Sequence, residues 1–257
     1  VYDQELDTLV SQYIRGEEGT YVDITVLRGE NAEETPLHVE RRSIEVPTVE
    51  YQMLENQVGY IYVTQFDEVT AKQFEDAIDD LEDQGMEKLV IDLRNNPGGV
   101  LDTAVEMLAY VLPEDKLDGM LVYTADKNGE GDRYFCKDGK IQRESDDGSR
   151  DSRYPKEDDH ELDVPLAVLV NGNSASASEV FTGAVMDYDA GIVVGTTTFG
   201  KGIVQNLIPL GDGTAIKLTT AHYYTPNGFD LHGKGLEPDV VVEMDEELQK
   251  KAVVELS

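Results

Sequence analysis

Short apolar runs alternate with amphipathic stretches of helical length from residue 58 to residue 195. The apolar runs have the length of strands, and the stretches between them repeat their apolar residues at helical spacing. Strands that alternate with helices are joined by crossover connections, which favours a largely parallel sheet covered by helices. We therefore expect an α/β fold with crossover β-α units. The expected strands are residues 60–66, 88–93, 120–124, 164–170 and 191–195, and the helices between them include Phe74, Leu108 and Phe181.

The residues before this alternation form an opening unit of their own. Residues 4–15 have a helical pattern, and residues 21–27 and 37–41 alternate as strands do. These elements are too few to close a hydrophobic core.

Three further segments have a distinct composition. Residues 125–163 are strongly charged and rich in Gly, Ser and Asp, which predicts an exposed insertion, either a solvated loop or, as the alternative, a lid over a cleft. Residues 204–210 and 214–220 flank Gly211-Asp-Gly213, which predicts a β-hairpin. Residues 245–256 are expected to form a capped helix.

Charge and cysteine content exclude several classes of function. The 257 residues include 53 acidic and 21 basic ones, a formal net charge of −32, which repels nucleic acids and anionic membranes. The single cysteine, Cys136, allows no internal disulfide and no thiolate metal site, so we expect a free thiol in a polar segment. The four histidines, His38, His160, His222 and His232, lack metal-ligand spacing. We expect neither a metal nor a cofactor.

The chain begins with Val1 rather than with a methionine, and it shows no signal peptide and no apolar run of membrane-spanning length. We expect it to be a piece of a longer protein, so the missing targeting segment says nothing about the compartment.

A serine cluster follows the expected strand at 164–170. Ser174, Ser176 and Ser178 alternate with alanines before the next helix, so the segment places a hydroxyl at the end of a strand beside free backbone N–H groups. The structural alternative is a capping box, in which Ser176 and Glu179 satisfy each other's N–H groups. Spacing alone leaves the choice of serine open, although the alanines beside Ser176 favour it.

Lys201 lies between two glycines, Gly200 and Gly202, after the strand at 191–195. A lysine that loses its hydration can take the proton of a serine, which makes it a candidate general base. Gln205 could orient the amine without adding a charge. The ordinary alternative is a surface lysine.

The segment Arg94-Asn-Asn-Pro-Gly98-Gly99 ends another strand. It is either an ordinary turn or a pair of glycines whose N–H groups stabilise an oxyanion. It is not a phosphate-binding loop. Residue order also leaves open a triad that uses His222 or His232.

Four blocks resemble those of the carboxyl-terminal processing, or tail-specific, proteases. They are Asp92-Leu-Arg-Asn-Asn-Pro-Gly-Gly99, Val170-Asn-Gly-Asn-Ser-Ala-Ser-Ala-Ser-Glu179, Thr198-Phe-Gly-Lys-Gly-Ile-Val-Gln205, and Tyr223-Tyr-Thr-Pro-Asn-Gly228 with His232-Gly-Lys-Gly-Leu-Glu-Pro-Asp239. The resemblance covers residues 60–239. It implies a Ser/Lys dyad of Ser176 and Lys201, oriented by Gln205, with an oxyanion hole from Ala177 and a glycine of the Gly98-Gly99 pair.

The same resemblance implies a ClpP/crotonase-like spiral core over residues 46–257, preceded at residues 1–45 by the second half of a PDZ module and a connecting strand. The carboxylate-binding loop of that module is missing, and Phe229-Asp-Leu231 departs from the usual residues.

The expected function is that of a serine endopeptidase that cleaves proteins near apolar C-terminal tails through an acyl-enzyme. We also expect an extracytoplasmic parent protein, at the cell surface, in the periplasm or beside a membrane, that could form homo-oligomers. The alternatives are a catalytically inert peptide-binding or scaffolding relative and a crotonase-type acyl-CoA enzyme.

Overall fold

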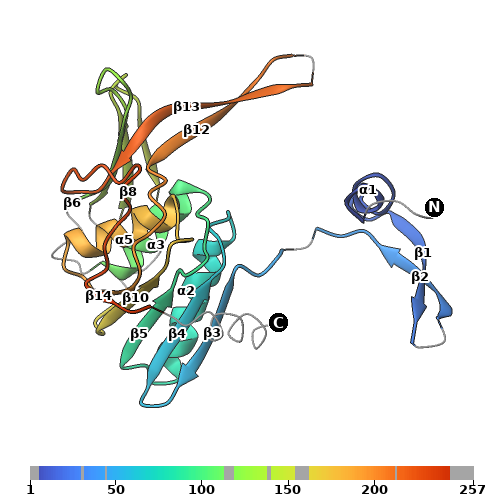
Figure 1. Cartoon of the computed structure of the whole chain (residues 1–257). Helices are drawn as coiled ribbons and strands as arrows, with labels where there is room; N and C mark the ends of the chain where they lie inside the picture. The colour runs from blue at the N-terminus through green and yellow to red at the C-terminus, as the bar shows by residue number, and fades with distance from the viewer. Residues whose placement is uncertain are drawn as a thin grey trace. The chain divides into compact units, whose positions relative to one another are not determined.

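The computed structural model describes residues 6–29, 32–43, 45–112, 119–137, 140–153, 162–211 and 213–243. The chain divides into two compact units, Val1–Val46 and Pro47–Ser257 (Figure 1). The helix expected at residues 245–256 lies outside the described residues. None of the helices in the described ranges is long and apolar enough to cross a membrane.

The N-terminal unit contains one helical segment and one hairpin. The expected helix is present as α1 (Leu6–Leu9) continued by the π-helical turn η1 (Val10–Ile14). The hairpin pairs β1 (Tyr21–Arg28) with β2 (Glu33–Glu40) in antiparallel register. Arg41 joins the two parts, because its guanidinium donates to the carbonyls of Ile14 and Tyr21.

A six-stranded sheet in the order β14-β11-β10-β5-β4-β3 forms the centre of the second unit. The pairs β4–β5, β5–β10, β10–β11 and β11–β14 are parallel, which confirms the expected crossover sheet, and only β3 is antiparallel. The strands are β3 (Val49–Leu54), β4 (Val58–Val63), β5 (Lys88–Asp92), β10 (Leu166–Val170), β11 (Ile192–Gly195) and β14 (Val240–Val241).

The described helices of this unit are α2 (Thr70–Asp83), α3 (Leu101–Val111) and α5 (Ala177–Asp187). Two of them, α2 and α5, pack against this sheet, and α3 packs against both of them. The face of α2 that carries Phe74, Ile78 and Leu81 is fully buried, as the helical spacing predicts. The helix ends before Gly85, whose φ of 85° is the left-handed conformation typical of a helix C-terminus.

A second, antiparallel sheet has the order β12-β13-β6-β7-β8-β9. It contains β6 (Gly119–Ala125), so the expected strand at 120–124 is present but does not belong to the parallel sheet. The remaining strands are β7 (Asp132–Lys137), β8 (Lys140–Ser145), β9 (Arg150–Arg153), β12 (Ile203–Pro209) and β13 (Ala215–Tyr224).

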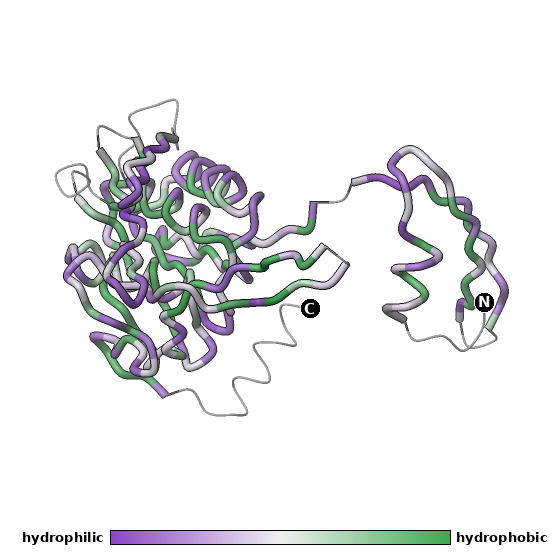
Figure 2. The backbone as a smooth tube through the Cα atoms, turned by 90° about the horizontal axis from the view of Figure 1, so that it is seen from above, coloured by the Kyte–Doolittle hydropathy of each residue, from purple (hydrophilic) through white to green (hydrophobic). Residues whose placement is uncertain are grey.

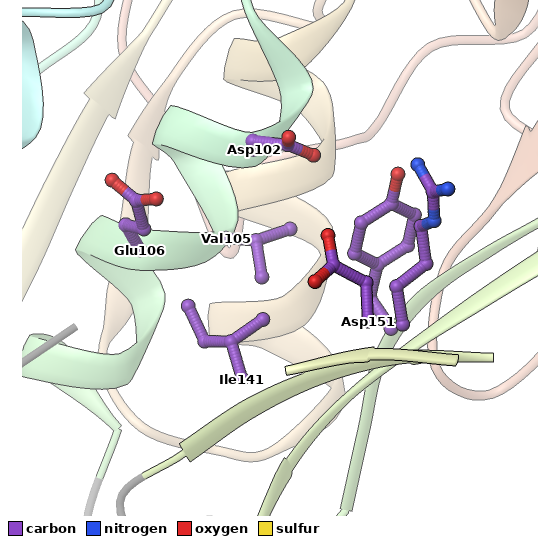
Figure 3. Close-up of a pocket in the computed structure, with 7 residues that line it drawn as sticks. Asp102, Val105, Glu106, Ile141 and Asp151 are labelled. Atoms are coloured by element: carbon purple, nitrogen blue, oxygen red, sulfur yellow. The ribbon is translucent and has the colours of Figure 1, made fainter. Parts of the chain in front are cut away.

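The prediction of a solvated loop at residues 125–163 is wrong for β7, β8 and β9. Tyr134, Cys136 and Ile141 of these strands are buried, whereas Arg133, Arg143 and Glu144 are only partly buried. Cys136 is therefore buried and in no disulfide, and the expected polar segment around it is a strand with a buried face. In Figure 3, Asp102, Val105 and Glu106 of α3 face Ile141 and Asp151, around a cavity of about 10 Å³.

The predicted hairpin after Lys201 is present as β12 and β13, and it projects from the body of the second unit (Figure 1). Both strands carry hydrophobic stretches (Figure 2). Leu207 is 71% exposed, and Ile208, Leu210, Ile216 and Leu218 are also exposed.

The burial of Tyr223 on β13 predicts a loss of stability at alkaline pH. Burial, together with the charge of Asp102, raises the pKa of Tyr223 to about 12 from the ordinary value of 10.0. Between these values the unfolded chain releases the proton and the folded chain keeps it, so the free energy of unfolding falls as pH rises. We expect the variant Tyr223→Phe to lose less stability than the wild type between pH 10 and pH 12 in urea-unfolding experiments. Equal slopes for the two proteins would contradict this assignment.

Candidate active site

Three loops meet at the carboxyl ends of neighbouring parallel strands. Asp92 of β5 pairs with Leu169 of β10, and Val170 of β10 pairs with Gly195 of β11. The loops that follow are residues 93–99, 171–176 and 196–202. In open α/β sheets this edge is where ligands bind.

The first two loops are joined by hydrogen bonds between asparagines. The main-chain N–H of Asn95 donates to the side chain of Asn171, and the amides of Asn171 and Asn173 both donate to the side-chain oxygen of Asn95, at 3.0 Å each. Asn95 has a φ of 63°, which asparagine tolerates better than most residues. These bonds fix the spacing between the two strand ends.

The three candidate serines have different environments. Ser174 and Ser178 are fully buried, and their hydroxyls donate to the carbonyls of Leu93 at 2.7 Å and Asn96 at 3.1 Å. Ser176 retains 8% of its surface and has a φ of 58°. A non-glycine residue in this region is strained, and the sharp turn from strand to helix resembles the elbow that presents the nucleophile in α/β-hydrolases. The hydroxyls of Ser174 and Ser178 therefore stabilise the loop. Of the three serines, Ser176 is the one with a strained backbone and some exposed surface.

Glu179 connects the serine loop to the lysine loop. Its side chain is fully buried and accepts four hydrogen bonds. The Oε2 atom accepts from the N–H groups of Ser176 at 2.9 Å and Lys201 at 2.8 Å. The main chains of Ser176 and Lys201 therefore lie within two hydrogen-bond lengths of each other.

The other oxygen of Glu179 fixes the rest of the lysine loop. Oε1 accepts from the hydroxyl of Thr198 at 2.6 Å and from the N–H of Gly200 at 2.7 Å. The capping box that the sequence predicts is thus present, but the same carboxylate also reaches a loop far away in sequence. Sequence analysis identified Glu179 only as a cap, because its local spacing carries no signal of these distant donors.

Lys201 lies two residues before the start of β12 and is half-buried, while Phe199, two residues earlier, is 62% exposed. Within the described ranges, no salt bridge involves the Lys201 side chain. Gln205 is exposed on β12, and its amide donates to the Thr219 hydroxyl at 3.3 Å rather than to Lys201.

Gly98 lies directly against the serine turn. A Cβ atom added to Gly98 would approach the Ser176 Cβ to 2.7 Å and the Ala177 nitrogen to 2.9 Å. Gly98 also has a φ of 94°, so no larger residue fits there. The structure thus brings Gly98, Ser176 and Ala177 together.

A salt bridge between Arg94 and Asp92 at the end of β5 restrains the loop that carries Gly98 and Gly99. The Arg94 guanidinium donates to both oxygens of the buried Asp92, and the Tyr60 hydroxyl donates to Asp92 at 2.6 Å. The hydrogen bond to Asp92 raises the pKa of Arg94, and burial followed by the bond to Asp92 raises the pKa of Tyr60. The sequence analysis assigned Asp92 and Arg94 no role beyond the motif. An acidic residue at the end of a buried strand could have indicated this ion pair.

The histidines form no metal site in the described part of the chain. His222 of β13 and His232 lie edge to face with ring centroids 4.9 Å apart, and His222 Nδ1 is 3.6 Å from Asp230. His38 belongs to the N-terminal unit, where it bonds to Asp23. His160 lies outside the described residues.

Comparison with known proteins identifies the family. The profile of "Peptidase family S41" matches residues 57–242, which include every residue of the candidate site. The chain belongs to peptidase family S41. It is 38% identical over 238 residues to a "Probable CtpA-like serine protease" of Staphylococcus aureus, and 37% identical over 242 residues to one of Staphylococcus haemolyticus. These alignments cover 93% and 94% of this chain but only 43% and 44% of the relatives.

Solved structures agree with this assignment. The structure titled "Photosystem II D1 C-terminal processing protease" superposes with a TM-score of 0.60 and 28% identity, covering 89% of this chain and 57% of that one. A putative S41 protease from Bacteroides fragilis superposes with a TM-score of 0.59 at 18% identity, covering 93% of this chain and 64% of that one, which supports the fold alone.

The four bonds to Glu179 predict a large effect of a near-isosteric change. Each oxygen of Glu179 accepts from at least one main-chain N–H, so the amide NH₂ of Glu179→Gln leaves at least one buried donor without a partner, at about 1–3 kcal/mol each. We expect a lower free energy of unfolding, measured in urea, and a loss of any Ser176-dependent hydrolysis. The exposed Glu55→Gln serves as a matched control with wild-type stability. Equal stability of the two variants would show that the buried carboxylate does not hold the loops.

Proposed function

We propose that this chain is the catalytic core of a serine endopeptidase that cleaves proteins near their C-terminal tails, with Ser176 as nucleophile and Lys201 as general base. The observation that carries the proposal is the buried Glu179, which holds the main chains of both residues through one oxygen atom. Membership of peptidase family S41 supports the same reaction class.

The proposed reaction proceeds in two steps. The Ser176 oxygen attacks the carbonyl carbon of the peptide bond while its proton passes to the neutral amine of Lys201, and the resulting ammonium protonates the departing amine. Water then attacks the acyl-serine, giving its proton to Lys201, and the proton returns to the Ser176 oxygen as the acid is released. No other reactant is required.

The proposed oxyanion hole consists of the N–H groups of Ala177 and Gly99. Ala177 is the first residue of α5, where N–H groups have no partner in the helix. Among the described residues, neither of these two N–H groups has a hydrogen-bond acceptor, whereas the Gly98 N–H is already bonded to Asn96. The helix N-terminus adds a favourable electrostatic contribution to negative charge at this point.

We assign Gln205 an orienting role once substrate has entered. Its amide now bonds to Thr219 at 3.3 Å, a weak bond on an exposed strand that a substrate can displace. A Gln205→Leu variant with unchanged turnover would refute this role.

A cavity of about 850 Å³ beside Gln205 is the proposed substrate groove. It is lined by Leu101 and Val204, which are close in sequence to Gly99 and Lys201, and by residues from β6, β7, β8 and β13. Five acidic residues and one arginine contribute to its walls: Asp126, Glu130, Asp132, Asp146, Asp147 and Arg143.

The remaining proposals rest on the resemblance to tail-specific proteases. They are apolar C-terminal tails as substrates, a partial PDZ module at residues 1–45, a spiral core, assembly into homo-oligomers and an extracytoplasmic location. Cell fractionation and light scattering test the last two, and both are refuted by a monomer confined to the cytoplasm.

Substitution of either dyad residue tests the proposed function. We expect Ser176→Ala and Lys201→Ala to lower the rate of peptide cleavage by at least about a thousandfold, because nucleophile and base act as a unit. Ser149→Ala and Lys217→Ala, at exposed positions, should retain wild-type rates. Cleavage that persists in both dyad variants refutes the mechanism, and a wild type inactive on unfolded proteins and tailed peptides favours an inert binding protein.

The acidic groove predicts a preference for substrate charge. We expect a peptide with lysine near the cleaved bond to have a higher kcat/KM than the same peptide with aspartate, because the groove attracts cations. Raising the salt concentration from about 0.1 M to 1 M should narrow the difference, since the screening length falls from about 10 Å to about 3 Å. A ratio that is independent of salt contradicts an electrostatic origin.

A further inference from the structure

Asn96 is a fully buried polar residue whose side chain connects two parts of the candidate site. Its amide nitrogen donates to the Val63 carbonyl at the end of β4, at 2.8 Å. Its side-chain oxygen accepts from the N–H of Gly98 at 2.9 Å. Both ends of the amide are therefore satisfied, and Gly98 is anchored to the central sheet.

The bond to Gly98 determines which glycine N–H remains open. With the Gly98 N–H held by Asn96, the Gly98 carbonyl accepts from Phe66 at 3.0 Å. In a trans peptide the C=O and the following N–H point in opposite directions, so the Gly99 N–H points away from Phe66. The Gly99 backbone lies close against Phe66, because a Cβ added to Gly99 would lie 1.8 Å from the Phe66 carbonyl oxygen, so no side chain fits there.

The main chain of Asn96 holds the other side of the proposed oxyanion hole. Its carbonyl accepts from the N–H of Ala175 at 3.0 Å and from the hydroxyl of Ser178 at 3.1 Å. These two residues flank Ser176 and Ala177. One buried residue thus contacts both loops that supply the proposed oxyanion donors.

We infer that Asn96 is a positioning residue for catalysis: its side chain fixes the Gly98–Gly99 peptide so that the Gly99 N–H stays aimed at the oxyanion beside Ser176. The inference rests on the proposed function and goes beyond the dyad. Asn96 does not touch the substrate. It acts through Gly99, and its effect belongs to the transition state, where negative charge develops.

Two variants and a control test this role. Asn96→Ala removes both side-chain bonds, and Asn96→Asp keeps an acceptor for Gly98 but loses the donor to Val63. We expect kcat to fall about 100-fold for Asn96→Ala and about tenfold for Asn96→Asp, with KM within about threefold of the wild type, as for lost oxyanion donors. Thr48→Val removes another buried hydrogen-bonding side chain, whose hydroxyl bonds to Thr70, and should keep the wild-type kcat.

A second readout separates positioning from general loss of structure. A peptide aldehyde forms a tetrahedral adduct with the serine and places an oxyanion in the hole, whereas the cleaved peptide product does not. We expect the affinity for the aldehyde to fall in parallel with kcat/KM in the Asn96 variants, and the affinity for the product to stay within about threefold. Thermal unfolding measured for all variants accounts for any common destabilisation.

The inference is overturned if both Asn96 variants keep kcat within twofold of the wild type, or if Thr48→Val lowers kcat as much as they do. If Asn96→Ala does not fold, Asn96→Asp decides by the same criterion. A wild type that cleaves no peptide, or a Ser176→Ala variant that still cleaves, refutes the proposed function instead.

Discussion

The candidate site depends on one buried side chain that receives four hydrogen bonds. Glu179 has no exposed surface, and its two oxygens accept from the main chains of Ser176, Gly200 and Lys201 and from the hydroxyl of Thr198. A carboxylate is costly to bury unless donors surround it, and here the donors come from two loops that are separate in sequence. The arrangement links loop geometry to folding stability, because the loops cannot separate without leaving the carboxylate unpaired.

Parallel strand pairing decides which loops can meet at all. The carboxyl ends of β5, β10 and β11 lie side by side, so the loops with Gly98, Ser176 and Lys201 leave the same edge of the sheet. The contacts among them then follow a consistent pattern: asparagine side chains join the first two loops, Glu179 joins the second to the third, and Asn96 connects the glycine turn to β4. Membership of peptidase family S41 is consistent with the serine-peptidase mechanism proposed for these residues.

Sequence patterns were most reliable where one period dominated. The buried face of α2 and the strands at 88–93 and 164–170 were predicted correctly, because 3.6-residue spacing and continuous apolar runs are strong local signals. The prediction failed at residues 132–153, where charged residues outnumber the inward-facing Tyr134, Cys136 and Ile141. A strand with one buried face needs only every second residue to be apolar, so a charged composition concealed it. The alanines beside Ser176 and the family resemblance favoured this serine, but its strained backbone and the distant carbonyls that accept from Ser174 and Ser178 were not visible in the sequence.

The sequence by itself determined the crossover α/β organisation of the second unit, the hairpin after Lys201 and the set of candidate residues, because local spacing and turn residues suffice for these. Only the tertiary structure decided which serine is strained, which glycine N–H is open and what Glu179 and Asn96 hold. These features consist of hydrogen bonds between residues tens of positions apart. Such bonds depend on strand order and register, and no local pattern of residues encodes them.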